Sequence, residues 1–156
     1  MGDRAVWGFR ESTTSPTIYL YGHWGGHRMM NRLCLGLVRV KAAGRENDAS
    51  YATRIMVSDM VSDHEDDLGW GITLTVPGDV QRRIPVVTWG RYHQRGLVPA
   101  TVGLWEIPNP YSGVGYNAPT ECIFLMGLDD FIARYEKEQP PLSPTCPHRG
   151  DYIMGK

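Results

Sequence analysis

The chain has 156 residues, with 16 Lys and Arg against 17 Asp and Glu, and 42% of its residues are hydrophobic. The length predicts one domain, and the apolar fraction is enough for a packed core and too high for a disordered chain. The balanced charge argues against a protein that coats DNA, although it leaves room for a local basic patch. The 18 glycines and 11 prolines exceed ordinary usage and predict many turns.

The cysteines and the apolar pattern bear on location. The three cysteines, Cys34, Cys122 and Cys146, are odd in number and widely spaced, which favours a reducing compartment over a disulfide framework. The first residues are charged and lack the apolar run of a signal peptide. No apolar stretch approaches the roughly 20 residues that span a bilayer. We therefore expect an intracellular protein that does not enter a membrane.

The first third of the chain predicts two strands and a helix. Residues 5–10 alternate weakly, and residues 17–21 are β-branched and aromatic. A helix is predicted over 27–43, where apolar residues recur at three- and four-residue spacing and Gly44 ends the pattern. Its apolar face would consist of Met29, Met30, Leu33, Cys34, Leu37 and Val38, with Arg28, Arg32 and Arg39 on the opposite face.

A second helix is predicted over 50–63, followed by a change to strands. Asp48 or Ser50 can cap the helix, and the acidic run 63–67 after it should lie in water. From residue 70 the apolar period becomes two, so Ile72, Leu74 and Val76 predict a half-buried strand.

The second half of the chain predicts further strands joined by turns. After a turn at 77–79, a strand is predicted over 83–89, at an edge or with a bulge because Pro85 lacks a backbone donor. Residues 90–96 predict another turn. Further predicted elements are a strand at 101–107, a long loop at 108–119, a strand at 122–126 and a helix at 128–137.

The predicted fold is a single α+β domain, residues 1–139. Short turns between the later strands favour antiparallel pairing. We therefore expect a single antiparallel sheet with two main helices on one face and a short C-terminal helix. Residues 140–156, rich in proline, predict a flexible tail.

The most informative segment runs from Tyr19 to Arg28. It predicts a strand, a Gly-Gly loop and a helix start, where unpaired backbone N–H groups attract anions and glycines allow close approach. Cations in a first turn oppose the helix dipole, and a bound phosphate or carboxylate would reverse that penalty. The candidate ligand-binding residues here are Tyr21, His23, Trp24, Gly25, Gly26, His27 and Arg28. The alternative is an ordinary turn whose side chains point into solvent, and the segment is no P-loop because it lacks the Lys-Ser/Thr pair.

Aromatic residues add to this candidate site. Tyr111 and Tyr116 lie in the long loop, and aromatic faces stack on bases while arginines contact phosphates. Trp24, Trp70, Trp89 and Trp105 are numerous for a small core, and the alternative is that they are core or near-core residues.

Asp59 stands inside the apolar stripe of the second helix. A carboxylate there is costly unless it is paired, and Arg4 or Arg54 could supply the partner. The two interpretations are a general acid or base and, favoured here, a structural polar tie between helix and sheet.

Metal and catalytic motifs are weak. His23 and His27 are four residues apart, but two glycines separate them and no third ligand is near in the sequence, so we expect no metal and no cofactor. No nucleophile motif or paired-carboxylate signature supports catalysis.

Several segments resemble, in order, a family of small uncharacterised proteins encoded by tailed bacteriophages. They are Met1-Gly2-Asp3-Arg4-Ala5, Tyr19-x-Tyr-x-His-Trp-Gly-Gly26, Tyr51-Ala-Thr-Arg-Ile-Met56 with Asp59-Met60, and Gly69-Trp-Gly-Ile72. The resemblance covers residues 1–76, and the His-Trp-Gly-Gly core is its most specific part. Members often carry glutamate at the position of Asp59 and a polar Thr where this chain has Gly22. The resemblance implies a phage accessory protein in the host bacterial cytoplasm and carries over no activity.

Three functions remain open from the sequence. The leading hypothesis is a non-enzymatic binder of a small anionic ligand, with a nucleotide such as a host immune signal as one candidate. The second is a protein-interaction module that inhibits a host factor, suggested by the acidic run and the tyrosine loop. The third is a hydrolase or nuclease built on His23, His27 and Asp59, which would need the three side chains in one pocket. A homo-oligomer is compatible with an unpaired strand edge.

Overall fold

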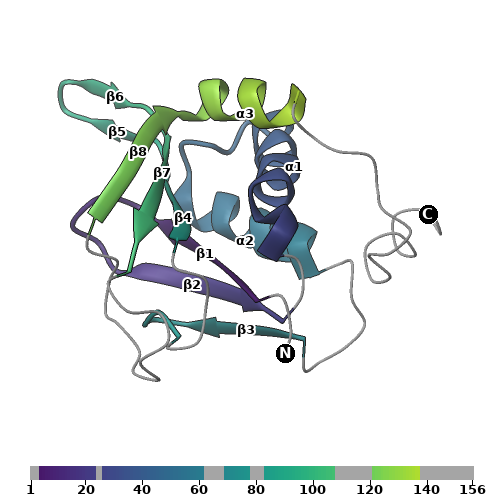
Figure 1. The fold of residues 1–156 in the computed structure, drawn as a ribbon. Coiled ribbons are helices and arrows are strands. Elements are labelled where there is room, and N and C mark those ends of the chain that lie inside the picture. Colours follow the sequence, from purple (N-terminus) through teal and green to yellow (C-terminus); the bar gives the residue numbers. More distant parts are fainter. Residues whose placement is uncertain (1–3, 24–25, 62–68, 78–82, 108–120, 138–156) are drawn as a thin grey trace.

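In the described part of the chain, six strands form the main sheet and three helices cover one face of it (Figure 1). The computed structural model describes residues 4–23, 26–61, 69–77, 83–107 and 121–137. The helices are α1 (Met29–Ala42), preceded by the short η1 (Gly26–Arg28), α2 (Ala49–Val61) and α3 (Leu128–Lys137). The strands of the main sheet are β1 (Ala5–Arg10), β2 (Thr17–Gly22), β3 (Trp70–Thr73), β4 (Arg83–Thr88), β7 (Thr101–Glu106) and β8 (Glu121–Gly127). The α+β class and the placement of the helices on one face are confirmed.

The sheet is mixed, so the prediction of an antiparallel sheet was wrong. Its order is β3-β2-β1-β4-β7-β8, and β1 pairs in parallel with β4 while the other neighbours are antiparallel. The antiparallel pairing expected between the later strands is present in β4–β7 and β7–β8, whereas β3 and β4, which follow each other in sequence, do not pair. Instead β3 adds to β2, and β4 inserts between β1 and β7. Long-range partner choice of this kind leaves no local signal.

A second sheet was missed, and the place of Pro85 was predicted wrongly. The turn predicted at 90–96, together with the two residues after it, forms the two-stranded antiparallel ribbon of β5 (Arg91–His93) and β6 (Gly96–Val98), with Gly96 at φ 121°. Pro85 lies in the central strand β4, not at an edge. The pairing of β4 with β1 begins at Val86, directly after the proline, so the parallel ladder starts where backbone donors are available again.

Apolar side chains lie on both faces of the sheet. On the helix side, Trp7, Phe9 and Leu20 join the main core with residues of all three helices. On the other face, Val6, Tyr19 and Val86 belong to a second buried cluster. The half-buried strand predicted from residue 70 is partly wrong, because Ile72 and Leu74 are exposed and only Val76 is buried. β3 is one of the two edge strands of the sheet.

α1 follows the predicted apolar period but uses a wider buried face. Met29, Leu33 and Leu37 are buried as expected. Arg28 and Arg32 are also buried, which contradicts their predicted place on the solvent side. One cause is Gly36: a Cβ there would come within 2.5 Å of the Met56 Cε atom, so the glycine allows α2 to pack closely on this side of α1.

The ends of the first two helices match their sequence signals. Gly44 has φ 66°, the N–H of Gly44 donates to the carbonyl oxygen of Lys41, and the N–H of Arg45 donates to that of Val40. This is a Schellman motif, as the glycine predicted. At the start of α2, the carbonyl oxygen of Asp48 accepts from the N–H of Ala52, so Asp48 is the cap residue.

No helix in the described part of the chain is long and apolar enough to cross a membrane.

Several predicted features lie outside the described residues. They are Trp24, Gly25, Tyr111, Tyr116, the acidic run 63–67, the loop 108–119 and the tail 140–156.

Gly90, the residue before β5, contacts the loop between α1 and α2. Its N–H donates to the carbonyl oxygen of Glu46 at 2.8 Å, and an added Cβ would lie 2.0 Å from Asn47 Oδ1. We expect Gly90→Ala to lower the midpoint of thermal unfolding, because the methyl group overpacks this contact at a cost of about 1–3 kcal/mol. Circular dichroism melting checks this. The double variant Gly90→Ala with Asn47→Ala should recover part of the loss, and equal melting of Gly90→Ala and wild type would refute the packing argument.

Candidate functional site

The end of β2 and the start of α1 meet at the site predicted from the sequence. Tyr21 and His23 lie edge to face, with ring centroids 6.1 Å apart, and the N–H of His23 donates to the carbonyl oxygen of Gly69 at 3.1 Å. In η1, His27 is exposed and Arg28 is 6% exposed. The structure therefore confirms the predicted strand and the helix start, with a 3-10 turn before the α-helix, while Trp24 and Gly25 of the predicted Gly-Gly loop lie outside the described residues.

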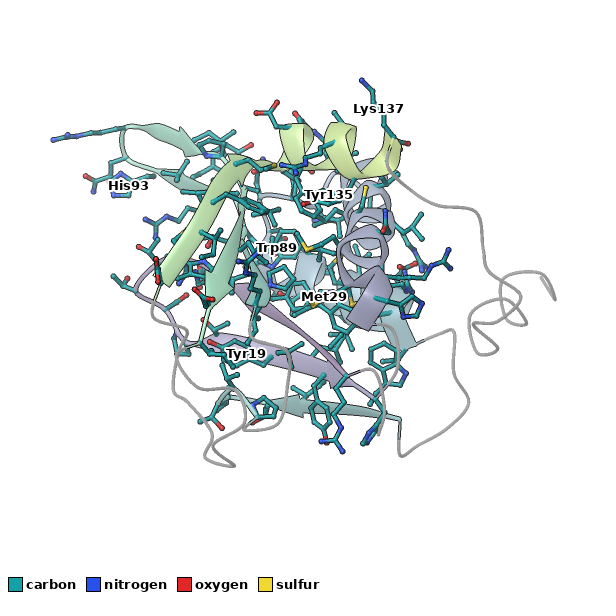
Figure 2. All side chains as sticks on the ribbon, in the orientation of Figure 1. Tyr19, Met29, Trp89, His93, Tyr135 and Lys137 are labelled. Atoms are coloured by element: carbon teal, nitrogen blue, oxygen red, sulfur yellow. The ribbon has the colours of Figure 1, made fainter. Side chains whose placement is uncertain are left out.

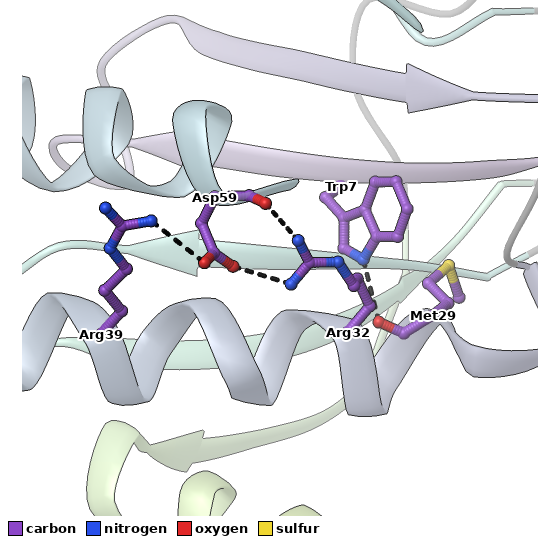
Figure 3. A network of polar contacts seen from close by, with 5 residues as sticks. All are labelled: Trp7, Met29, Arg32, Arg39 and Asp59. Carbon is purple, nitrogen blue, oxygen red and sulfur yellow. Dashed lines mark hydrogen bonds and ion pairs between the residues drawn. The ribbon is translucent and has the colours of Figure 1, made fainter. Parts of the chain in front are cut away.

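Arg28, Arg32 and Arg39 follow one another along one side of η1 and α1, at spacings of four and seven residues. We call these three residues the arginine row. Arg32 Nη1 lies 2.7 Å from Asp59 Oδ2 on α2, and Arg39 Nη1 lies 3.3 Å from Asp59 Oδ1 (Figure 3). Arg32 Nη2 also donates to the backbone carbonyl oxygen of Asp59. Asp59 thus bridges two members of the row.

The bridge at Asp59 differs from the one expected. The ion pairs of Asp59 within the described part of the chain are with Arg32 and Arg39 of α1, so these pairs join two helices rather than a helix and the sheet. Of the partners proposed from sequence, Arg54 is exposed on α2. Because Arg32 is only 5% exposed, its guanidinium group needs a carboxylate nearby to offset the loss of water. The signal that sequence reasoning missed is the four-residue spacing of Arg32 and Gly36, which puts the arginine one helical turn from the glycine that allows α2 to pack closely.

Trp7 ties the sheet to the start of α1. Its indole N–H donates to the carbonyl oxygen of Met29 at 3.0 Å (Figure 3), and its ring stacks on Trp70 at 5.9 Å between centroids. A buried indole that has found a backbone acceptor fixes the position of the helix start. The place of Arg28, which directly precedes Met29, is therefore set by the core and not by a loop.

A hydrolytic centre receives little support from this geometry. Both carboxylate oxygens of Asp59 are engaged by guanidinium groups, which favours the structural role of this residue. Among the described residues, no group of three or more His, Cys, Asp and Glu side chains could hold a metal ion.

The two described cysteines differ in exposure, so we expect them to differ in reactivity. Cys34 is 2% exposed, and burial, helped by Glu136, raises the pKa of its thiol to about 11, whereas Cys122 is exposed. Because the thiolate is the reactive form, iodoacetamide at pH 8 should alkylate Cys122 in the native protein and spare Cys34 until the chain is unfolded. Peptide mass mapping checks this. Equal native labelling of both would contradict the burial of Cys34.

Two adjoining cavities lie beneath the ribbon of β5 and β6. One, of about 510 Å³, is lined by Glu11, Gly44, Arg45, Asn47, Asp48, Ala49, Ser50 and Tyr92. The other, of about 380 Å³, is lined by Lys41, Glu46, Asn47, Leu97, Pro99, Ala100, Gly127, Leu128, Asp129 and Asp130. Asn47 lines both. Sequence reasoning missed this region because it assigned the ribbon to a turn.

Comparison with protein-family models, with curated protein sequences and with solved structures finds no match.

Proposed function

We propose that the protein is a non-enzymatic binder of a small anionic ligand, held where β2 meets α1. One observation carries the proposal. From Gly26 to Ala42 the chain has four Lys and Arg residues and no Asp or Glu, and Arg28, which lies at the junction itself, is buried in the fold. Cations held in a low-dielectric setting attract an anion far more strongly than cations in water do.

The residues at the junction have distinct roles in this proposal. Arg28 is the anchor, because a planar guanidinium group can donate two parallel hydrogen bonds to a phosphate or carboxylate. His27, exposed beside it, adds a donor at the mouth of the site. Tyr21 and His23 supply aromatic rings close to the same turn, and such rings stack on a base. This combination favours a nucleotide over a simple inorganic anion.

The resemblance to small bacteriophage proteins gives the proposal its setting. A binder of this kind in the host bacterial cytoplasm would sequester a nucleotide that signals infection. The rival idea, a module that blocks a host protein, was suggested by segments outside the described residues and stays a prediction.

Isothermal titration of the full chain tests the proposal. The probes are nucleoside mono-, di- and triphosphates, cyclic mono- and dinucleotides, and inorganic phosphate. We expect saturable heat with at least one nucleotide and weaker binding as salt increases, because charge attraction is screened. The variant Arg54→Gln, which removes an exposed arginine from α2, should bind as the wild type does. No heat with any probe would overturn the proposal.

A further inference from the structure

The ribbon of β5 and β6 is a basic arm with unpaired edges. All of its strand residues are exposed, and the segment from Arg91 to Val98 contains Arg91, His93 and Arg95 and no Asp or Glu. His93 lies on the ribbon away from the helices and the main sheet (Figure 2). The two strands pair only with each other among the described residues, so each keeps one free edge. A free edge of this kind is a template for pairing with another chain.

Apolar side chains accompany the charges on this arm. Tyr92 is 78% exposed, and Leu97 and Val98 are 49% and 42% exposed. Tyr92 and Leu97 face each other across the ribbon and line the two cavities beneath it. Exposed apolar residues gathered on one small element are typical of an interaction surface.

The base of the arm is acidic. The two cavities are lined by five carboxylates, from Glu11, Glu46, Asp48, Asp129 and Asp130, and by two cations, Lys41 and Arg45. Both cations have partners within the cavity walls, since Lys41 binds Asp129 and Arg45 Nη1 lies 3.5 Å from Asp48 Oδ2. Three carboxylates are then in excess. One oxygen of Glu46 is buried and makes no hydrogen bond in the structure.

We propose that a second copy of this chain binds beside the ribbon and the two cavities at its base. The two arms then lie side by side and antiparallel around a two-fold axis. In such a pair each basic tip lies beside the acidic base of the other arm, so the charges complement each other twice. If β6 pairs with β6 around Leu97, Arg95 stands opposite Pro99 of the other copy. Pro99 lines the same cavity as Asp129 and Asp130, which brings Arg95 to the carboxylates. The exposed Leu97 and Val98 side chains become covered in the same step.

A nucleic acid is the less favoured partner for the arm. The basic tip suits phosphates, but the excess of carboxylates at the base repels them. A second copy uses charges of both signs and the free edge of β6 in each arm, and it requires nothing beyond the chain itself.

Sedimentation velocity of the full chain, from micromolar to millimolar concentration, tests the proposal. We expect a dimer whose dissociation constant rises with salt and rises by about tenfold or more in Arg95→Glu, because like charges then meet. Arg54→Glu, an equal charge reversal on the exposed side of α2, should leave the dissociation constant unchanged.

A charge swap distinguishes the loss of a direct contact between the two copies from damage to the fold by the substitution. Arg95→Glu combined with Asp130→Lys should restore the dimer, because the ion pair across the interface is rebuilt with reversed signs. Three results would each overturn the proposal: a monomer at every concentration, a dimer that Arg95→Glu does not weaken, or a swap that fails to recover at least part of the affinity. Binding of a duplex DNA by a monomeric chain would instead assign the arm to nucleic acid.

Discussion

Replacing Asp59 with Ala should lower the free energy of unfolding by about 3–5 kcal/mol, the largest loss expected from a single polar side chain in the described structure. Arg32 is 5% exposed and donates two hydrogen bonds to Asp59, one to the carboxylate and one to the backbone carbonyl oxygen. Removing the carboxylate leaves the guanidinium charge of Arg32 buried beside α2 without this carboxylate partner. Urea denaturation followed by far-UV circular dichroism measures the change.

A second ion pair serves as the control for Asp59. Asp129 also pairs with a cation of α1, Lys41, but its side chain is 77% exposed. Water and salt screen such a pair, so Asp129→Ala should cost about 1 kcal/mol or less. If the two variants lose equal stability, the buried setting of the bridge contributes nothing and the account of the arginine row is wrong.

Replacing Trp7 with Ala should cost about 3–5 kcal/mol, because it empties a large volume at the centre of the main core. Trp7 is 1% exposed, stacks on Trp70 and donates its indole N–H to Met29. The loss should appear both as a lower midpoint in urea and as a change in near-UV circular dichroism from the tryptophan pair.

Trp7→Phe separates packing from hydrogen bonding at this position. It keeps most of the apolar contact and removes the hydrogen bond to the first residue of α1, so a loss of about 1–2 kcal/mol is expected. Since that bond positions the turn that carries Arg28, ligand affinity should fall as well. A Trp7→Phe protein that binds and unfolds like the wild type would show that the start of α1 is positioned by other contacts.

The sequence allowed the helices and their stops to be predicted because these depend on neighbours in the chain. The apolar period of α1, the glycine at φ 66° after it and the capping Asp48 all act within a few residues. Local signals of the same kind predicted where β2 ends and where the following helix begins.

Features that depend on contacts between residues far apart in the sequence were not predicted. The parallel pairing of β1 with β4 joins residues about 78 positions apart, as in Phe9 and Val87, and no local pattern encodes it. Arg32 was expected in solvent because arginine usually lies there, yet Gly36 and Asp59 create a buried place for it. The ribbon was read as a turn because each of its strands has only three residues.

The most direct test of the anion-binding account is a calorimetric titration of wild type, Arg28→Gln and Arg54→Gln with the same nucleotide panel. We expect one or more nucleotides to bind the wild type and Arg54→Gln equally, and Arg28→Gln to lose about tenfold or more in affinity, as the loss of charge-assisted hydrogen bonds predicts. His27→Ala, a change at an exposed side chain, gives a smaller loss and guards against misfolding of Arg28→Gln. Arg28→Gln and His27→Ala proteins that both bind as tightly as the wild type, or a wild type that binds no nucleotide, would contradict the account.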